Sequence, residues 1–130
     1  MRIAQIAPLQ AATPPHSYGG TERVIYNLTE SLVQLGHAVT LFATGDSHTS
    51  ARLVPGVAAA VNFDPDTVIS AYHIAMLENV YRHASDFDVI HSHLDHLTLP
   101  FIGTTRTPTV LTPRFVPALI AGEPDERSKL

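Results

Sequence analysis

Four potential metal ligands lie within six residues, in the segment His91-Ser92-His93-Leu94-Asp95-His96. Imidazole nitrogens and carboxylate oxygens both bind zinc, and a strand that ends in such a cluster can direct several of them at one ion. A zinc ion held in this way activates a bound water molecule. The segment therefore raises the alternative of a zinc-dependent hydrolase that uses His91, His93, Asp95 and His96.

The rest of the chain gives the zinc alternative little support. The H-x-H-x-D-H pattern resembles that of the metallo-β-lactamase superfamily, whose sites use further ligands downstream, and no histidine follows His96. The segment is also explained as a polar strand end that faces a cleft and bonds to backbone or ligand. We expect no bound metal and no cofactor, and we retain His91, His93 and Asp95 as candidate cleft residues.

A second candidate site is the turn Tyr18-Gly19-Gly20-Thr21, which separates an expected strand from an expected helix. Ligands of open α/β sheets bind at the carboxyl ends of strands, and N–H groups at a helix start attract phosphate oxygens. We predict that Gly19, Gly20 and Thr21 form a diphosphate-binding loop, in which a Cβ atom would obstruct the ligand. The spacing is not G-x-G-x-x-G. The alternative is that both glycines only allow a tight turn.

A third segment, Gly45-Asp46-Ser47-His48, is similar to the G-D-S start of some serine esterases. Those nucleophiles follow the first strand and use an Asp-x-x-His pair near the chain end, and neither condition is met here. We expect a turn in which Asp and Ser side chains cap local backbone groups.

Hydrophobic patterning predicts the elements that position these segments. Arg2–Pro8 is an apolar run typical of a buried strand, and Ala38–Ala43 predicts a second strand. Between them we expect a helix with Thr21 as its N-cap and Gly36 as its C-terminal stop. Its expected apolar face comprises Val24, Ile25, Leu28, Leu32 and Leu35. A strand, a helix and a strand in this order predict a βαβ unit with parallel strands.

The second half repeats this alternation. Residues Gly45–Phe63 predict mostly loop, and Asp64-Pro65 predicts a helix start with Asp as cap and Pro in the first helical position. The apolar stripe expected of this helix comprises Ile69, His73, Met76, Leu77 and Val80. Further short strands are expected at Asp88–His91 and Thr109–Thr112. The fold class is therefore α/β, with a Rossmann-like, doubly wound parallel sheet.

The C-terminal part has a different composition, because five of the ten prolines fall in the final 31 residues. We predict a Rossmann-like domain over residues 1–112 and an irregular tail over 113–130. The sheet is expected to be incomplete on its C-terminal side.

Composition excludes several classes of protein. The 130 residues are 45% hydrophobic and 15% charged, with a net charge of −4 and a single lysine, Lys129. Binding to nucleic acid or to an anionic membrane needs clustered positive charge, so neither partner is expected. No apolar run approaches the ~18 residues of a spanning helix. Gln5, Pro8 and Gln10 interrupt any signal-peptide core, and we expect a cytoplasmic protein.

Five segments, taken in order, resemble the N-terminal domain of retaining GT-B glycosyltransferases of the glycogen-synthase-like and sucrose-synthase-like superfamily. They are RIAQIAP, YGGTERV, LVQLGHAVTLFATGDS, FDVIHSHLDHLTLP and PTVLT, which together cover about the first 112 residues. YGGTERV and GHAVTLFATGDS are similar to bacterial members in particular.

The resemblance implies two Rossmann-like domains facing a cleft. The N-terminal domain receives the acceptor, and the C-terminal domain binds a nucleotide-diphosphate sugar, whose sugar moves to an acceptor hydroxyl with retention and without a metal. Gly19 and Gly20 match the loop that approaches the donor diphosphate. His91, His93 and Asp95 match a segment that runs along the cleft, and no catalytic residue is identified among them.

Two departures from this family bear on activity. In similar proteins the strand resembling PTVLT continues into T-x-H-G, whereas here Pro113-Arg114-Phe115 follows Thr112. The C-terminal domain of those proteins has no counterpart in this sequence, so we expect a truncated transferase with little or no turnover alone. The alternative is a non-catalytic binding or assembly module that pairs with a separately encoded C-terminal half.

Overall fold

A parallel sheet of five strands forms the centre of the computed structural model, which describes residues 1–17, 19–62 and 64–113. The strand order is β3-β2-β1-β4-β5, and every neighbouring pair is parallel. The strands are β1 (Arg2–Ile6), β2 (Ala38–Thr44), β3 (Arg52–Val57), β4 (Val89–Ser92) and β5 (Thr109–Leu111). The predicted Rossmann-like, doubly wound α/β sheet is confirmed.

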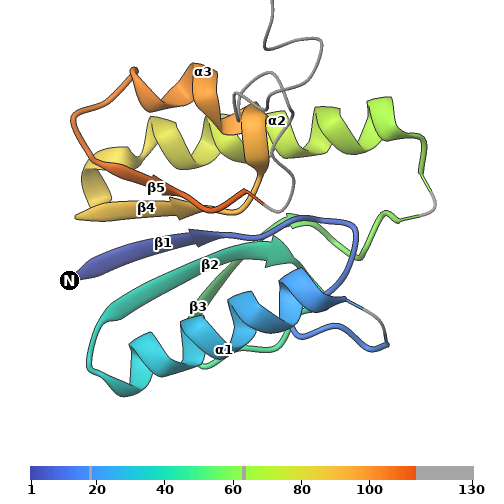
Figure 1. Cartoon of the computed structure of the whole chain (residues 1–130), viewed down its shortest axis with the longest axis horizontal. Helices are drawn as coiled ribbons and strands as arrows, with labels where there is room; N and C mark the ends of the chain where they lie inside the picture. Colours follow the sequence, from blue (N-terminus) through green and yellow to red (C-terminus); the bar gives the residue numbers. More distant parts are fainter. Residues whose placement is uncertain (18, 63, 114–130) are drawn as a thin grey trace, which may run out of the picture.

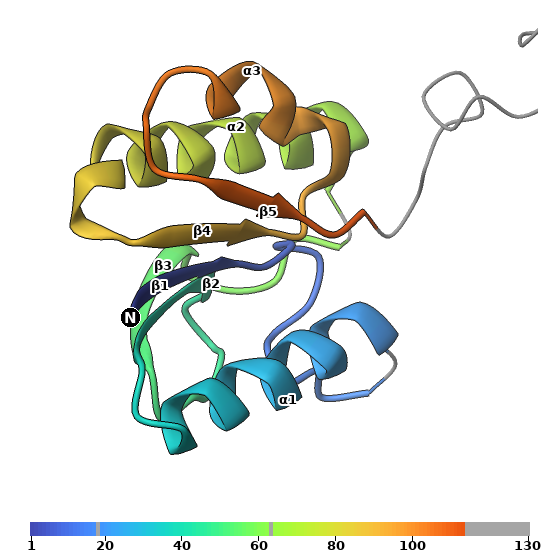
Figure 2. The same ribbon diagram turned by 60° about the vertical axis from the view of Figure 1, so that its left-hand side comes forward.

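Helices cover both faces of this sheet. The helices are α1 (Gly20–Gln34), α2 (Asp66–Arg82) and α3 (Leu99–Ile102), with 3-10 turns η1 (Ala84–Asp86) and η2 (Asp95–Thr98). Figures 1 and 2 show α1 on one face of the sheet and α2 with α3 on the other. The predicted βαβ unit is β1-α1-β2, whose strands pair in parallel from Arg2 opposite Ala38 to Ile6 opposite Phe42.

The larger core lies under α2. The whole predicted stripe of this helix is buried, together with Tyr81. These side chains pack on Ala4, Ile6, Phe42 and Ile90 of the sheet. A smaller cluster on the opposite face joins Ile25 of α1 to Ala7, Leu41 and Ala43. Burial of both faces explains why β1 and β2 are apolar almost throughout.

The expectation that Gly45–Phe63 is mostly loop missed one strand, because Arg52–Val57 forms β3 and pairs with β2. Pro55 and Gly56 weaken the local preference for a strand, but both are tolerated in β3 because it is an edge strand. A Cβ atom on Gly56 would lie 2.6 Å from Met76 Sδ. Glycine at this position therefore lets β3 approach α2 closely.

The predicted start and face of α1 need correction. Gly19 is the N-cap and Gly20 the first helical residue, so Thr21 lies inside the helix and makes no capping bond. Ile25 is fully buried, whereas Val24 is 63% and Leu35 74% exposed. The buried positions beside Ile25 are taken by Glu22 and Thr29. The helix is rotated in this way because Ile25 fits above the small side chains of Ala7 and Ala43.

The remaining boundaries shift by one or two residues. Pro65 is the N-cap of α2, because its carbonyl accepts the N–H groups of Val68 and Ile69 at 2.9 and 3.0 Å, so Asp64 lies outside the helix. The strands end at Ile6, Thr44, Ser92 and Leu111. Gly36, with φ of 95°, ends α1 as predicted.

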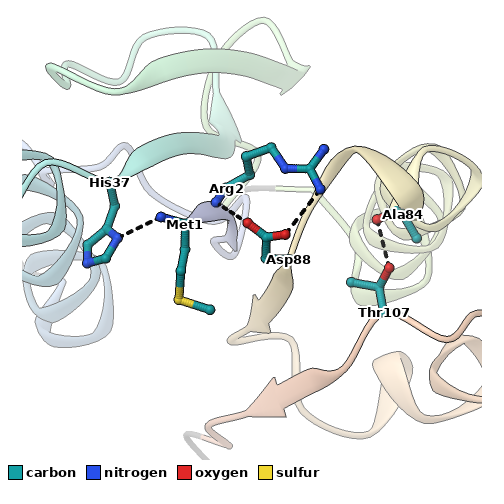
Figure 3. A network of polar contacts seen from close by, with 6 residues as sticks. All are labelled: Met1, Arg2, His37, Ala84, Asp88 and Thr107. Carbon is teal, nitrogen blue, oxygen red and sulfur yellow. Dashed lines mark hydrogen bonds and ion pairs between the residues drawn. The ribbon is translucent and has the colours of Figure 1, made fainter.

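Polar contacts join the strands at the amino edge of the sheet (Figure 3). The terminal amino group of Met1 lies 3.1 Å from His37 Nδ1. Arg2 donates its backbone N–H and its guanidinium to Asp88, at 2.7 and 3.1 Å. This pair raises the pKa of Arg2 and lowers that of Asp88, in each case mainly through the side-chain hydrogen bond.

The predicted tail lies almost wholly outside the described residues, which end at Pro113. Tyr18 of the glycine-rich turn is also outside them. No helix in the described ranges has the length and apolar character to cross a membrane.

Candidate functional site

The two predicted site segments meet where the strand order reverses. β1 lies between β2 and β4, so the chain leaves β1 toward one side of the sheet and later returns to its other side. Ligands of doubly wound sheets bind at this point, outside the carboxyl ends of the strands. In Figure 2 the arrowheads of β1 and β4 point to the side on which α1 begins. The glycine-rich turn and the histidine segment therefore share one edge.

A cavity of about 440 Å³ lies between these two segments. It is lined by Gly20, Thr21, Val24, His93, Thr112 and Pro113. A second cavity, of about 300 Å³, lies on the other side of the helix start and includes Gly19, Gly20, Glu22, Gln10 and Asn62 in its lining. We refer to the first as the α1–β4 cavity.

The two glycines of the turn have different surroundings. A Cβ atom on Gly19 would lie 2.8 Å from Pro15 Cβ and 3.0 Å from Glu22 Oε1, so Gly19 is needed for packing of the loop. A Cβ atom on Gly20 would meet nothing within 4 Å. The first N–H groups of a helix have no partner within the helix. A ligand can therefore approach the backbone at Gly20.

His93 forms the opposite wall of the α1–β4 cavity. Its backbone N–H donates to Ile6 O at 3.0 Å, which places the residue directly beyond β4 and beside β1. The residue is only 3% exposed, and Nε2 lies 2.9 Å from Gln5 Oε1. Burial, aided by the neighbouring His91, lowers the pKa of His93 to about 3. The ring is therefore neutral near pH 7.

His91 and Asp95 lie close to His93 but differ in their contacts. The His91 and His93 rings are in contact, with centroids 4.1 Å apart and planes tilted by 37°, and His91 Nε2 lies 2.7 Å from Thr112 Oγ1. Burial lowers the pKa of His91. Asp95, with φ of 51°, lines a cavity of about 160 Å³ together with His93 and His96.

The possible ligands of the zinc alternative do not gather as a set. Within residues 1–17, 19–62 and 64–113, no group of three or more His, Asp or Glu side chains is placed to hold a metal ion. The Nε2 atoms of His91 and His93 instead face Thr112 and Gln5. Both rings thus contact side chains in, or directly after, neighbouring strands, and the interpretation of the segment as a polar strand end stays a prediction.

The structure adds residues that sequence reasoning did not assign to the site. Val24 and Thr112 line the α1–β4 cavity, and Gln5 bonds to His93 from the centre of the sheet. The only signal for Gln5 is that it interrupts an apolar strand. Ser47 has a structural role that differs from the local cap predicted, because its hydroxyl accepts the N–H of Thr13, 34 residues away in sequence, at 2.9 Å and contacts Thr44 Oγ1.

Comparison with solved structures identifies proteins of similar fold. AviGT4, a glycosyltransferase involved in avilamycin A biosynthesis, is similar with a TM-score of 0.62 and 27% identity, over 88% of this chain and 32% of AviGT4. The chain thus spans about a third of that protein. The C-terminal domain of the PF1911 hydrogenase from Pyrococcus furiosus shares the fold alone, with a TM-score of 0.54 and 12% identity over 85% and 89% of the two chains.

Comparison of sequences gives the family. No curated protein matches the chain. Residues 18–124, however, match the family model described as Glycosyltransferase Family 4. This range includes α1 with its glycine-rich start, and it includes the histidine segment after β4. The chain belongs to Glycosyltransferase Family 4.

Proposed function

We propose that residues 1–112 are the N-terminal, acceptor-side domain of a GT-B glycosyltransferase. The enzyme moves a sugar from a nucleotide-diphosphate donor to an acceptor hydroxyl, with retention. The observation that carries this proposal is the α1–β4 cavity, where the open backbone at Gly20 faces His93. In this proposal the diphosphate lies beside the backbone at Gly20, and the sugar lies beside His93.

The diphosphate side depends on backbone groups. No Lys or Arg is among the described residues that line the α1–β4 cavity, so side-chain cations do not hold a phosphate there. The unpaired N–H groups and the positive end of the helix dipole favour an anion at the start of α1. Gly20 leaves room for such an approach because no atom occupies the position of its side chain.

The His93 side of the α1–β4 cavity positions the sugar and contributes little acid–base chemistry. His93, whose pKa is about 3, is too weak a base to remove a proton from a hydroxyl near neutral pH. None of the described residues lining the α1–β4 cavity is a carboxylate. This agrees with a mechanism in which the donor phosphate itself helps to deprotonate the acceptor. The protein then contributes orientation and stabilises the departing diphosphate.

The proposed enzyme needs a second domain that faces this edge of the sheet. The chain spans 32% of AviGT4, and catalysis depends on holding donor and acceptor together. We therefore expect weak nucleotide-sugar binding and little turnover from the 130 residues alone. The alternative of an assembly module, which pairs with a separate C-terminal half, stays a prediction.

The proposal is tested by binding, since turnover is expected to be low. UDP-glucose, ADP-glucose and GDP-mannose are each titrated into ¹⁵N-labelled chain, and amide shifts are followed at Gly20, Thr21 and His93. Gly20→Val places a side chain into the site, and we expect binding to weaken at least ten-fold. Gly103→Val is the matched control, because a Cβ atom at Gly103 also meets nothing within 4 Å and Gly103 lines none of the cavities above.

Two results would count against the proposal. One is that none of the three nucleotide sugars shifts the amides at the start of α1. The other is that Gly20→Val binds as tightly as the unsubstituted chain, with both variants folded by circular dichroism. Gly19 is less suitable for this test, because a side chain there would disturb Pro15 as well as any ligand.

A further inference from the structure

Gln5 is an unusual residue for its position. It lies in β1, the central strand of the sheet, and is 0% exposed. Strands buried on both faces are normally apolar, because a buried amide loses its bonds to water. The cost of burying the Gln5 amide is only partly compensated, since its Nε2 atom has no hydrogen-bond partner among the described residues. An amide that costs stability in this way suggests a role other than packing.

Among the described residues, the side chain of Gln5 makes one hydrogen bond, and this bond fixes the state of His93. Gln5 Oε1 lies 2.9 Å from His93 Nε2 and, as a carbonyl oxygen, can only accept. His93 Nε2 therefore carries the ring proton. Because His93 is neutral, the other ring nitrogen, Nδ1, has a lone pair and no hydrogen. No described residue is hydrogen-bonded to Nδ1, and His93 lines two cavities.

We propose that Gln5 is a positioning residue that holds His93 in the Nε2–H tautomer, so that Nδ1 accepts a hydrogen bond from a ligand hydroxyl. The ligand class is therefore a polyhydroxylated molecule, such as the sugar of the donor or of the acceptor. This role toward a ligand rests on the proposed function, whereas the tautomer of His93 does not.

The surroundings of His93 contain few groups that could replace Gln5. The tilted ring of His91 contacts the His93 ring, and the Nε2 atom of His91 faces Thr112. Across the cavity of about 160 Å³ lie Asp66 and His73 of α2, with Asp95 and His96 of η2. The α1–β4 cavity adds no described charged residue. Within this shell, Gln5 is the residue that bonds to the His93 ring.

The first test measures the tautomer directly. Long-range ¹H–¹⁵N spectra of the histidine rings distinguish an Nε2–H ring from an Nδ1–H ring and from a doubly protonated ring. We expect Nε2–H for His93 in the unsubstituted chain at pH 7. In Gln5→Met, which keeps the length of the side chain but removes the acceptor, the proton should move to Nδ1. Gln34→Met is the control, because Gln34 is exposed at the end of α1 and lines none of the cavities described above, so it should leave His93 unchanged.

A second variant changes the charge at the same place. Gln5→Glu puts a carboxylate beside Nε2, so His93 should become doubly protonated at a higher pH than in the unsubstituted chain. The proposal is overturned if His93 of the unsubstituted chain is an Nδ1–H ring. It is equally overturned if Gln5→Met leaves the tautomer as it was.

The ligand role is measured with UDP-glucose and UDP as a pair of probes. Loss of one neutral hydrogen bond weakens binding by about five-fold, so Gln5→Met should weaken UDP-glucose by that factor and leave UDP unchanged. Equal weakening of both probes would show that Gln5 acts on the loop rather than through a sugar hydroxyl, and would overturn the ligand role. If UDP-glucose, ADP-glucose and GDP-mannose all fail to bind the unsubstituted chain while the tautomer results hold, the proposed function fails and the positioning by Gln5 stands.

Discussion

Acid should destabilise this domain through His93, because burial in the folded state disfavours protonation of the ring. The pKa of His93 falls from 6.5 to about 3 on folding, mainly through burial and further through His91. Below pH 6.5 the unfolded chain binds a proton at this residue and the folded chain does not. Unfolding is therefore favoured increasingly as the pH falls from 6.5 toward 3.

The size of this effect follows from linkage. Each pH unit within the window changes the free energy of unfolding by about 1.4 kcal/mol for one such group. Between pH 7 and pH 5, protonation of His93 in the unfolded chain should lower the free energy of unfolding by about 2 kcal/mol. The change is smaller than that for two full pH units, because the interval from pH 7 to pH 6.5 lies above the pKa of the unfolded state. A loss of this size is a large fraction of the stability of a small domain.

The assay is urea unfolding followed by circular dichroism at pH 7, 6 and 5. His93→Gln removes the titrating ring, so the loss of stability from pH 7 to pH 5 should be smaller by about 2 kcal/mol in this variant. His83→Gln is the control, because His83 is an exposed histidine at the end of α2. Parallel stability curves for the unsubstituted chain and His93→Gln would refute the reasoning, as they would show that His93 titrates equally in both states.

The remaining predictions concern contacts away from the candidate site. Gly56→Ala should lower stability by about 1 to 2 kcal/mol, because the new Cβ would lie 2.6 Å from the buried Met76 sulfur. Thermal melting measures this against Gly103→Ala, and an equal melting temperature for the two variants would contradict it. The Glu30 carboxylate accepts hydrogen bonds from Thr49 and Ser50. Burial alone raises the pKa of Glu30, but these hydrogen bonds outweigh burial, so the pKa is lowered. Glu30→Gln should therefore cost about 1 kcal/mol above pH 5 and less in acid, where the carboxyl of the unsubstituted chain is protonated. Urea unfolding at pH 7 and pH 3 measures the difference, and a cost that does not decrease in acid would contradict the assignment.

Local patterns in the sequence predicted most of the elements and the edge of the sheet that carries the site. The stripe from Ile69 to Val80 has helical spacing, and it is buried as expected. The βαβ unit follows from a strand, a helix and a strand in succession, whose crossover requires parallel pairing. Because parallel strands all end at one edge, the glycine-rich turn and His93 had to lie on the same side of the sheet.

Tertiary structure alone decided the features that depend on a distant partner. β3 forms although Pro55 and Gly56 disfavour a strand, because β2 offers an edge for pairing. Ile25 is buried and Val24 is exposed, because the small side chains of Ala7, just beyond β1, and Ala43 of β2 leave space for Ile25. Gln5 and His93 are 88 residues apart in sequence, and their bond exists only because β1 and β4 are neighbours. The sequence determined at which edge of the sheet the candidate site lies, and the packing of strands distant in sequence determined which residue contacts its histidine.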